Sequence, residues 1–217
     1  MMACTADGKF LPPYVVYKAE HVYDTWTQNG PDGARYNRSK SGWVDNVIFQ
    51  DWFLKVALPY FKKLPKEDPK ALIGDNLAAH ISTEVVDSCE KNNIKFILLP
   101  ANSTHLTQPL DVSVFRPMKR HWRQIVATHK QSNKTSNISK ADFPGLLRKV
   151  LEKASSNDGQ NIRSGFRKCG ISPLNRNEVL ELLPDASPAD HSEQHMTDSF
   201  VEFLREARTS ERGQTRV

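Results

Sequence analysis

Residues 70–119 read KALIGDNLAAHISTEVVDSCEKNNIKFILLPANSTHLTQPLDVSVFRPMK, and this stretch decides the fold that we expect. It places Asp75 at the end of a short apolar run and Asp111 at the start of a long helical pattern. The run ALIG (71–74) is short and apolar, which favours a buried central strand. Asp75 would then leave the carboxyl end of that strand, where sites in α/β sheets commonly lie.

A second strand is expected after one intervening helix. Ser82 or Thr83 can cap that helix, which would end near Asn92, and residues 94–99 (IKFILL) form the next apolar run. A strand, a helix and a strand at this close spacing predict a parallel pair joined by a crossover.

A basic helix is expected at residues 110–129, after a turn at 100–104. Pro109 suits the first helical turn because its missing N–H costs nothing there. Asp111 would lie in that turn and point toward the sheet edge where Asp75 emerges. The cations of this helix fall largely on a face beside its apolar one; they are Arg116, Lys119, Arg120, Arg123 and Lys130.

The charge distribution suggests a partner for this helix. The chain has a net charge of +5, and residues 112–141 contain seven Lys/Arg and no acid. A local basic block of this kind is typical of a nucleic-acid contact. Composition alone supports a solvated helix face equally well.

The segments before residue 70 are expected to surround this unit. Residues 1–19 predict a β-hairpin with Asp-Gly at its turn, and the polar residues 20–42 predict an exposed loop. A helix should begin at residue 41 or 42 and run to about 58, with Trp43 and Trp52 as core anchors.

The segments after residue 130 are expected to be helical and then irregular. The patterns predict helices at 142–154 and 162–168, the second closed by Gly170, and a last ordered turn at 177–183. We expect three parts: a core at 1–130, a helical extension of the same domain at 131–183, and an acidic flexible tail at 184–217 with a short helix at 196–208.

Composition restricts the class of protein. The chain has 217 residues, enough for one sizeable domain, and no apolar run of the length that a membrane span requires. The N-terminus lacks the pattern of a secretory signal. Three scattered cysteines give neither a disulfide framework nor zinc-type spacing. These features favour an intracellular protein.

Two carboxylates at one sheet edge suggest phosphate chemistry. Two divalent cations can activate the attacking oxygen and stabilise the leaving oxygen of a phosphodiester. Mg²⁺ and Mn²⁺ prefer carboxylate oxygen as a ligand. As a bare pair the signal is weak, because Asp75 could cap a helix and Asp111 could complement a helix dipole.

The surrounding sequence is more specific. It includes GDNLAAH (74–80), ILLPANSTHLTQPLDVSVFRPMK (97–119), NIRSGFRKCGISPLNRNEVL (161–180), and the N-terminal ADGKFLPPYVVYKA with the SGW of 41–43. In these blocks the chain resembles the DDE superfamily endonuclease domain of pogo, Tigger and jerky transposases. The resemblance implies an RNase H-like fold, a mixed α/β sheet with helices on both faces. It also implies DNA as the partner and Mg²⁺ or Mn²⁺ held by three carboxylates, of which Asp75 matches the second and Asp111 the third.

The sequence also departs from the family pattern. The first carboxylate of the family lies on a strand before the ADG hairpin, and this chain starts inside that hairpin. Asp7 would lie at the hairpin tip, and Glu20, Asp24 and Asp32 lie in the expected loop. We therefore expect a truncated domain, lacking the first strand, whose strand cleavage and transfer are impaired. The alternative is a non-enzymatic, domesticated nuclear module that binds DNA or protein.

Four polar residues flank the two aspartates. Asn76 and His80 follow Asp75, and His105 and Gln108 precede Asp111. One interpretation has them orienting the carboxylates or touching phosphate in a shell around the metal. The other makes them hydrogen-bonded structural residues, and the sequence favours neither.

Overall fold

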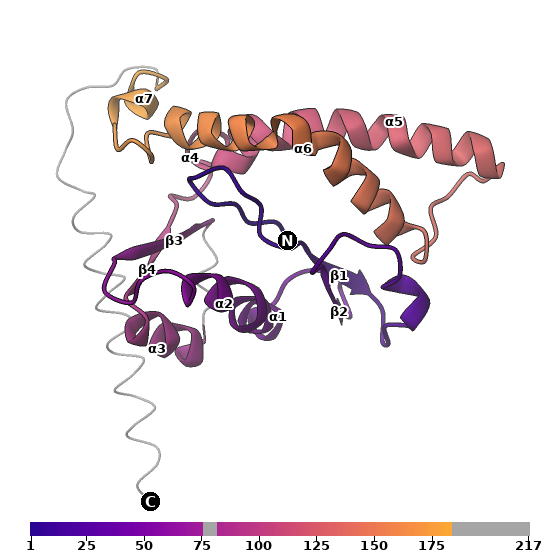
Figure 1. The fold of residues 1–217 in the computed structure, drawn as a ribbon, viewed down its shortest axis with the longest axis horizontal. Helices are drawn as coiled ribbons and strands as arrows, with labels where there is room; N and C mark the ends of the chain where they lie inside the picture. The colour runs from indigo at the N-terminus through magenta and orange to yellow at the C-terminus, as the bar shows by residue number, and fades with distance from the viewer. Residues whose placement is uncertain (76–81, 184–217) are drawn as a thin grey trace, which may run out of the picture. The chain divides into compact units, whose positions relative to one another are not determined.

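The structure, a computed structural model, describes residues 1–75 and 82–183 (Figure 1), without the side chains of 155–158. The chain divides into two units, Met1–Val179 and Leu180–Val217. The fold described below is that of the first unit, which is of the α/β class. The helix expected at 196–208 lies outside the described residues.

A parallel strand pair forms in the first part of the chain. Strand β1 (Tyr14–Lys18) pairs with β2 (Arg35–Ser39) in the register Tyr14↔Arg35. The connection between them contains one 3₁₀ turn, η1 (Asp24–Trp26). The prediction of a continuous exposed loop at 20–42 is therefore wrong over β2. The sequence of β2, RYNRS, has no apolar pattern, and its strand form depends on the backbone ladder to β1.

The N-terminal turn has the predicted position but a different partner. The chain returns antiparallel, with a bridge between Cys4 and Phe10 and a hydrogen bond from Leu11 N to Ala3 O at 2.9 Å. Gly8 takes a φ of 96° at the turn, a conformation that costs glycine little. The first arm pairs with residues up to Tyr14, whose N donates to Met1 O at 3.0 Å. From Tyr14 on, the second arm of the expected hairpin, β1, makes its ladder to β2.

The first long helical segment starts later than predicted. Helix α1 (Asn46–Trp52) begins where the Asp45 carboxylate accepts a hydrogen bond from Ile48 N at 2.9 Å, which satisfies a free N–H of the first turn. It continues through the π-helical turn η2 (Phe53–Ala57) into α2 (Leu58–Phe61). Trp52 is 5% exposed and belongs to the core, as predicted, whereas Trp43 is 78% exposed because it precedes the helix.

The predicted strand–helix–strand unit is confirmed. Strand β3 (Lys70–Gly74), helix α3 (Thr83–Lys91) and strand β4 (Ile94–Leu98) follow in order, and β3 pairs parallel with β4. The prediction of fully buried strands is wrong, because Ala71 is exposed and Ile97 is 43% exposed. Within the described ranges, β4 is the one strand that pairs with β3.

The main core forms around the α1–η2–α2 segment. It joins α1, η2 and α2 to residues of β1, α3 and β4, with Phe53 and Val85 fully buried. Phe49 packs edge-on to Phe96 of β4, with ring centroids 6.0 Å apart. Burial of these apolar side chains is the main favourable term that holds β3 and β4 in place.

The C-terminal part is helical. A short helix α4 (Thr104–Thr107) leads into the π-helical turn η4 (Leu110–Val114), the long α5 (Phe115–Asn133), α6 (Phe143–Lys168) and α7 (Asn177–Leu180). Helices α5 and α6 lie side by side (Figure 1). A single helix α6 replaces the two that we predicted at 142–154 and 162–168. Gly170 follows its end at a φ of 63°, as predicted.

The structure supports part of the predicted fold class. Helices combined with small parallel sheets are compatible with a DDE nuclease fold. The described residues form two separate two-stranded sheets. The RNase H-like sheet, the missing first strand and the division into three parts remain predictions.

Candidate metal and nucleic-acid site

Asp75 is positioned by the end of strand β3. Its neighbour Gly74 pairs with Leu98 of β4, and Gly74 O accepts a hydrogen bond from Leu99 N at 2.8 Å. Both strands therefore end at the same edge of the sheet. Asp75 follows β3 there, and Pro100 follows Leu99 at the end of β4. The Asp75 side chain is exposed.

Asp111 is connected to the same edge by a chain of short-range hydrogen bonds. The Ser103 hydroxyl donates to Pro100 O at 2.7 Å. Gln108 N donates to Thr104 O at 3.1 Å, and Asp111 N donates to Gln108 O at 3.0 Å. Asp111 lies in the first turn of η4 with its side chain exposed, which confirms the predicted helical position.

Helix α6 packs against η4. Leu110 and Val114 of η4 are buried against Ile162 of α6. Gly165 lies so close that an added Cβ would come within 2.6 Å of Pro109 O. The backbone that carries Asp111 is therefore fixed by packing, while the carboxylate faces solvent.

The two aspartates have the donor chemistry for a hard cation. Within residues 1–75 and 82–183, neither carboxylate takes part in an ion pair or a side-chain hydrogen bond, so their oxygens are available to Mg²⁺ or Mn²⁺. The amide oxygen of Gln108 is buried without a hydrogen-bond partner. No cluster of three or more His, Cys, Asp or Glu suited to a metal forms in the described part. Asp75 and Asp111 thus have the chemistry of two carboxylate ligands of a metal site.

The four flanking residues divide into two groups. Asn76 and His80 lie outside the described residues. His105 is exposed in α4, and Gln108 is half-buried at its C-terminal end. Their proposed role around the metal remains a prediction.

The predicted cations of α5 are open to solvent. Arg116, Lys119, Arg120 and Arg123 are exposed, and Lys130 is half-buried. No carboxylate of the described chain forms an ion pair with any of them. The opposite side of α5 contacts α6, where the rings of Trp122 and Phe143 lie 5.6 Å apart. Packing therefore directs an unneutralised basic face outward.

The role of α6 was missed in the sequence analysis. Gly165 sits inside the block NIRSGFRKCGISP, and a glycine within a helical pattern often marks a close approach of another backbone. Lys149 and Lys153, one helical turn apart on α6, were also missed, although they flank the apolar positions of that helix.

The comparisons with known proteins identify the class. The family model of the DDE superfamily endonuclease matches residues 1–186, so the chain belongs to this family. The recognised resemblance to pogo, Tigger and jerky proteins is confirmed.

Particular relatives are found among transposon-derived proteins. The human pogo transposable element with KRAB domain is 27% identical over 177 residues, covering 79% of this chain and 28% of that protein. The human Tigger transposable element-derived protein 7 is 31% identical over 100 residues, covering 42% and 18% respectively. No solved structure matches the chain.

A further relative carries a name of another kind. The MFS-type transporter clz9 of Cochliobolus lunatus is 30% identical over 193 residues, which cover 84% of this chain and 20% of that protein. Among the described residues of this chain, no helix is long and apolar enough to cross a membrane. The chain spans about a fifth to under a third of the length of the first relatives that it matches.

Proposed function

We propose that the chain is a DNA-binding DDE domain in which Asp75 and Asp111 hold a divalent cation, Mg²⁺ or Mn²⁺. The observation that carries the proposal is their placement. Asp75 follows the end of β3, and Asp111 is linked to the same edge of the β3–β4 pair by short-range hydrogen bonds. Both side chains are exposed, and neither carboxylate has an ion-pair or hydrogen-bond partner within the described ranges. A bound cation would supply the polarisation of a phosphate oxygen and the activation of a water or hydroxyl.

The protein residues contribute position and charge. The close contact of Gly165 with Pro109 holds η4 against α6, which keeps Asp111 at a defined place. The basic face of α5 would contact the DNA backbone and set its register without reading bases. Gln108 would contribute its unpaired amide oxygen to the surroundings of Asp111.

We also propose that strand cleavage by this chain alone is impaired. The family resemblance assigns two of its three catalytic carboxylates to residues of this sequence, Asp75 and Asp111. Two carboxylates bind a hard cation less tightly than three, and they leave the two-metal arrangement without one of its ligands. A nuclear location follows from the proposal that DNA is the partner.

The test separates metal binding from cleavage. Mn²⁺ binding by the purified chain should be measurable by titration and should weaken on Asp75→Asn or Asp111→Asn. Asp32→Asn, in the exposed connection between η1 and β2, is the matched control and should bind as the original chain does. Unchanged affinity in both site variants would remove the proposed metal site.

A plasmid-nicking assay with Mn²⁺ examines cleavage in the same preparations. We expect little nicking by the original chain. Robust nicking that Asp75→Asn abolishes would contradict the proposed impairment while supporting the metal site.

A non-enzymatic binding module is the second candidate, favoured by the exposed and unneutralised cations of α5. It predicts DNA binding that persists in Asp75→Asn with Asp111→Asn and weakens in Arg120→Ala with Arg123→Ala. Loss of DNA binding in the aspartate variant at intact fold would contradict this candidate.

A further inference from the structure

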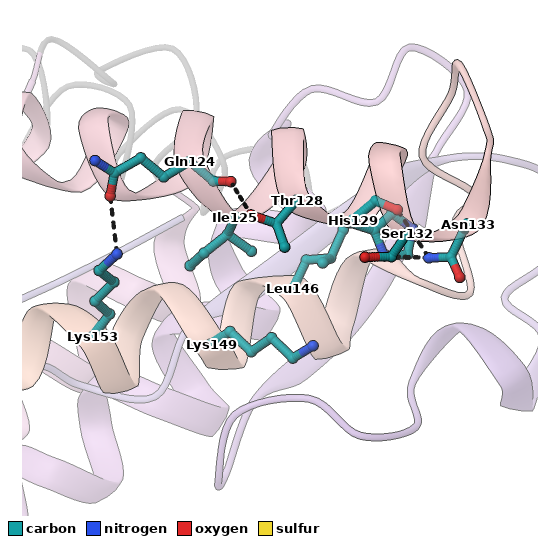
Figure 2. A pocket seen from close by; sticks show the side chains of 9 residues that line it. All are labelled: Gln124, Ile125, Thr128, His129, Ser132, Asn133, Leu146, Lys149 and Lys153. Carbon is teal, nitrogen blue, oxygen red and sulfur yellow. Dashed lines mark hydrogen bonds between the residues drawn. The ribbon is translucent and has the colours of Figure 1, made fainter.

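A groove runs between α5 and α6, apart from Asp75 and Asp111. It forms a hollow of about 270 Å³. Figure 2 shows Ile125 and Leu146 between the two helices, with polar side chains along the rim. Along α5 these are Gln124, Thr128 and Ser132, spaced four residues apart. Along α6 they are Lys149 and Lys153, which have the same spacing.

The charge of this groove is positive and unneutralised. Lys153 Nζ donates to the neutral amide oxygen of Gln124 at 2.9 Å. Within the described chain neither Lys149 nor Lys153 forms an ion pair with a carboxylate, and none of the residues that line the hollow is acidic. Two ammonium groups above an apolar floor attract an anion more strongly than they would in open water.

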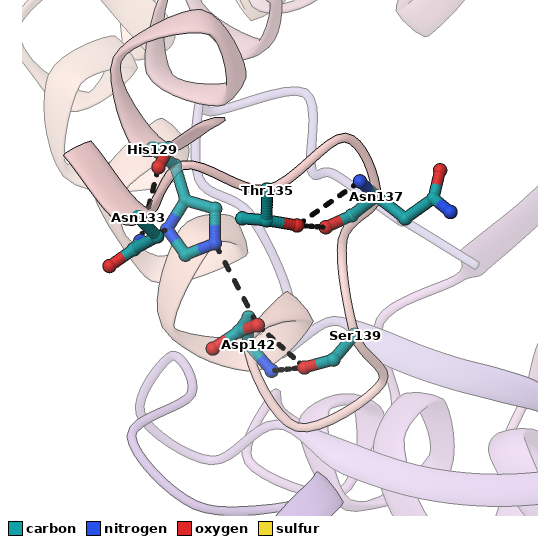
Figure 3. Close-up of polar contacts among 6 residues, drawn as sticks. All are labelled: His129, Asn133, Thr135, Asn137, Ser139 and Asp142. Atoms are coloured by element: carbon teal, nitrogen blue, oxygen red, sulfur yellow. Dashed lines mark hydrogen bonds and ion pairs between the residues drawn. The ribbon is translucent and has the colours of Figure 1, made fainter. Parts of the chain in front are cut away.

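Local hydrogen bonds order the connection between the two helices of the groove. Asn133 Nδ2 lies 3.0 Å from His129 Nδ1 and donates to His129 O at 3.1 Å. The Ser139 hydroxyl donates to Asp142 Oδ2 at 2.5 Å and accepts from Asp142 N at 3.0 Å (Figure 3). These bonds order the end of α5 and the start of α6, on either side of the loop that joins the helices.

His129 lies at the end of the groove, with its Nε2 facing the Asp142 carboxylate at 3.7 Å. An amide Nδ2 can only donate, so Nδ1 of the ring accepts from Asn133, and a neutral ring then carries its proton on Nε2. That nitrogen is buried and has no hydrogen-bond partner, because Asp142 Oδ2, at 3.7 Å, is too distant for one. Asp142 lines the neighbouring hollow, which also contains Arg148 and Lys149.

We propose that the groove defined by Gln124, Thr128, Ser132, Lys149 and Lys153 binds consecutive phosphate groups of a nucleic-acid strand. The lysines would neutralise the phosphates, and the Ser132 hydroxyl and the Gln124 amide N–H groups would donate to their oxygens. The Thr128 hydroxyl donates to Gln124 O at 3.1 Å, so it would contribute as a polar wall group and not as a donor. The inference takes nucleic acid as its ligand from the proposed function. Its residues are separate from the aspartates and from the basic face of α5.

The repeat of the groove favours a strand over a single free anion. Residues four apart on a helix are about 6 Å apart along its axis, and the polar groups repeat at this interval on both walls. A row of polar groups at a regular spacing suits a ligand whose phosphates also repeat. A free phosphate would occupy one position and leave the other lysine unneutralised.

The test is the affinity of the full chain for a fluorescent DNA duplex or single strand, measured by polarisation over a range of salt concentrations. Lys149→Gln with Lys153→Gln should weaken binding on the order of tenfold at low salt. It should also lower the slope of log affinity against log salt by about two, one for each phosphate contact that is lost. Both side chains are exposed, so the thermal midpoint should not change.

The matched control removes the same charge elsewhere. Lys62→Gln with Lys63→Gln changes two exposed lysines in the connector before β3 and should leave the affinity close to that of the original chain. Equal weakening by both variants would show that the affinity depends only on net charge. It would overturn the proposal that the groove binds nucleic acid.

Two further arms separate this inference from the proposed function. Weakening by the groove variant with unchanged binding in Arg120→Ala with Arg123→Ala would support the groove and contradict the α5 face. Inorganic phosphate at matched ionic strength should not displace the DNA more than chloride does. Displacement that depends on Lys149 and Lys153 would make the groove a site for free phosphate. It would overturn the proposal that the groove binds a nucleic-acid strand.

Discussion

Four side chains form a polar network next to strand β1: Tyr14, Asn37, Asp51 and Lys55. Buried Tyr14 donates its hydroxyl to Asp51 Oδ2 at 2.5 Å and accepts from Asn37 Nδ2 of β2 at 2.7 Å. Lys55, one turn along, lies 2.6 Å from the other carboxylate oxygen. The network joins both strands of the first sheet to the helical segment that forms the core.

Asp51→Asn should destabilise the fold. Burial raises the pKa of Asp51, but hydrogen bonds from Lys55 and Tyr14 outweigh it and hold the pKa below its usual value. An amide cannot reproduce both charge-assisted contacts, so we expect a loss of about 1–3 kcal/mol in the free energy of unfolding. Urea denaturation at neutral pH measures it. Lys62→Gln, in the exposed connector, is the control and should be neutral.

The same network sets a pH dependence. A depressed carboxyl pKa gives stability that is present above the ordinary pKa near 4 and is lost as the pH falls through the folded value. The difference in unfolding free energy between the original chain and Asp51→Asn should therefore shrink as the pH approaches 3. A difference that stays constant from pH 7 to pH 3 would mean that the carboxylate charge contributes nothing.

At the scale of elements, two glycines of α6 offer a matched pair. A Cβ on Gly165 would lie 2.6 Å from Pro109 O, whereas one on Gly145 would have its nearest neighbour at 3.8 Å. Gly165→Ala should cost about 1–3 kcal/mol because it forces α6 away from η4. Gly145→Ala should be neutral or stabilise by up to about 1 kcal/mol, since alanine favours the helix.

Thermal and urea denaturation of the two glycine variants measure these effects. Gly165→Ala should also weaken Mn²⁺ binding if the packing of η4 against α6 positions Asp111. Equal stability of the two variants would show that α6 and η4 do not pack as closely as described. Loss of stability with unchanged Mn²⁺ affinity would separate the packing of η4 from the proposed metal site.

Local pattern predicted the elements whose own residues carry the signal. The apolar run of β3, the cap at Ser82 and the apolar run of β4 specified a parallel unit that the structure contains. Strand β2 was missed because RYNRS becomes a strand only through pairing with β1. We predicted two helices, at 142–154 and 162–168, but α6 is one continuous helix that packs against η4 and the N-terminal turn.

At the scale of the whole molecule, the sequence predicted where the aspartates lie along the chain better than what surrounds them. Asp75 at a strand end and Asp111 in a first helical turn follow from the residues next to each. The contact of Gly165 with Pro109 and the groove beside Lys149 and Lys153 join segments of different helices, and no local pattern contains that information. Trp43 and Trp52 show the same limit, because only the helix start at Asn46 separates the exposed ring from the buried one.

The charge of the whole molecule gives a prediction for the α5 face. If Arg120 and Arg123 contact phosphates, DNA affinity should fall steeply as salt rises, because each contact releases condensed counterions. Arg120→Ala with Arg123→Ala should lower the slope of log affinity against log salt by about two and weaken binding to unrelated duplexes by similar factors, since phosphate contacts do not read bases.

Polarisation titrations on two duplexes of different sequence provide the measurement, with Lys62→Ala and Lys63→Ala as the variant of equal charge. The chain has a net charge of +5, so loss of any two cations reduces its long-range attraction for DNA slightly. Loss of two direct contacts reduces the salt slope itself, which the control pair should leave unchanged. A wild-type affinity that does not respond to salt would contradict phosphate contact by α5, and an effect confined to one duplex would instead indicate contact with bases.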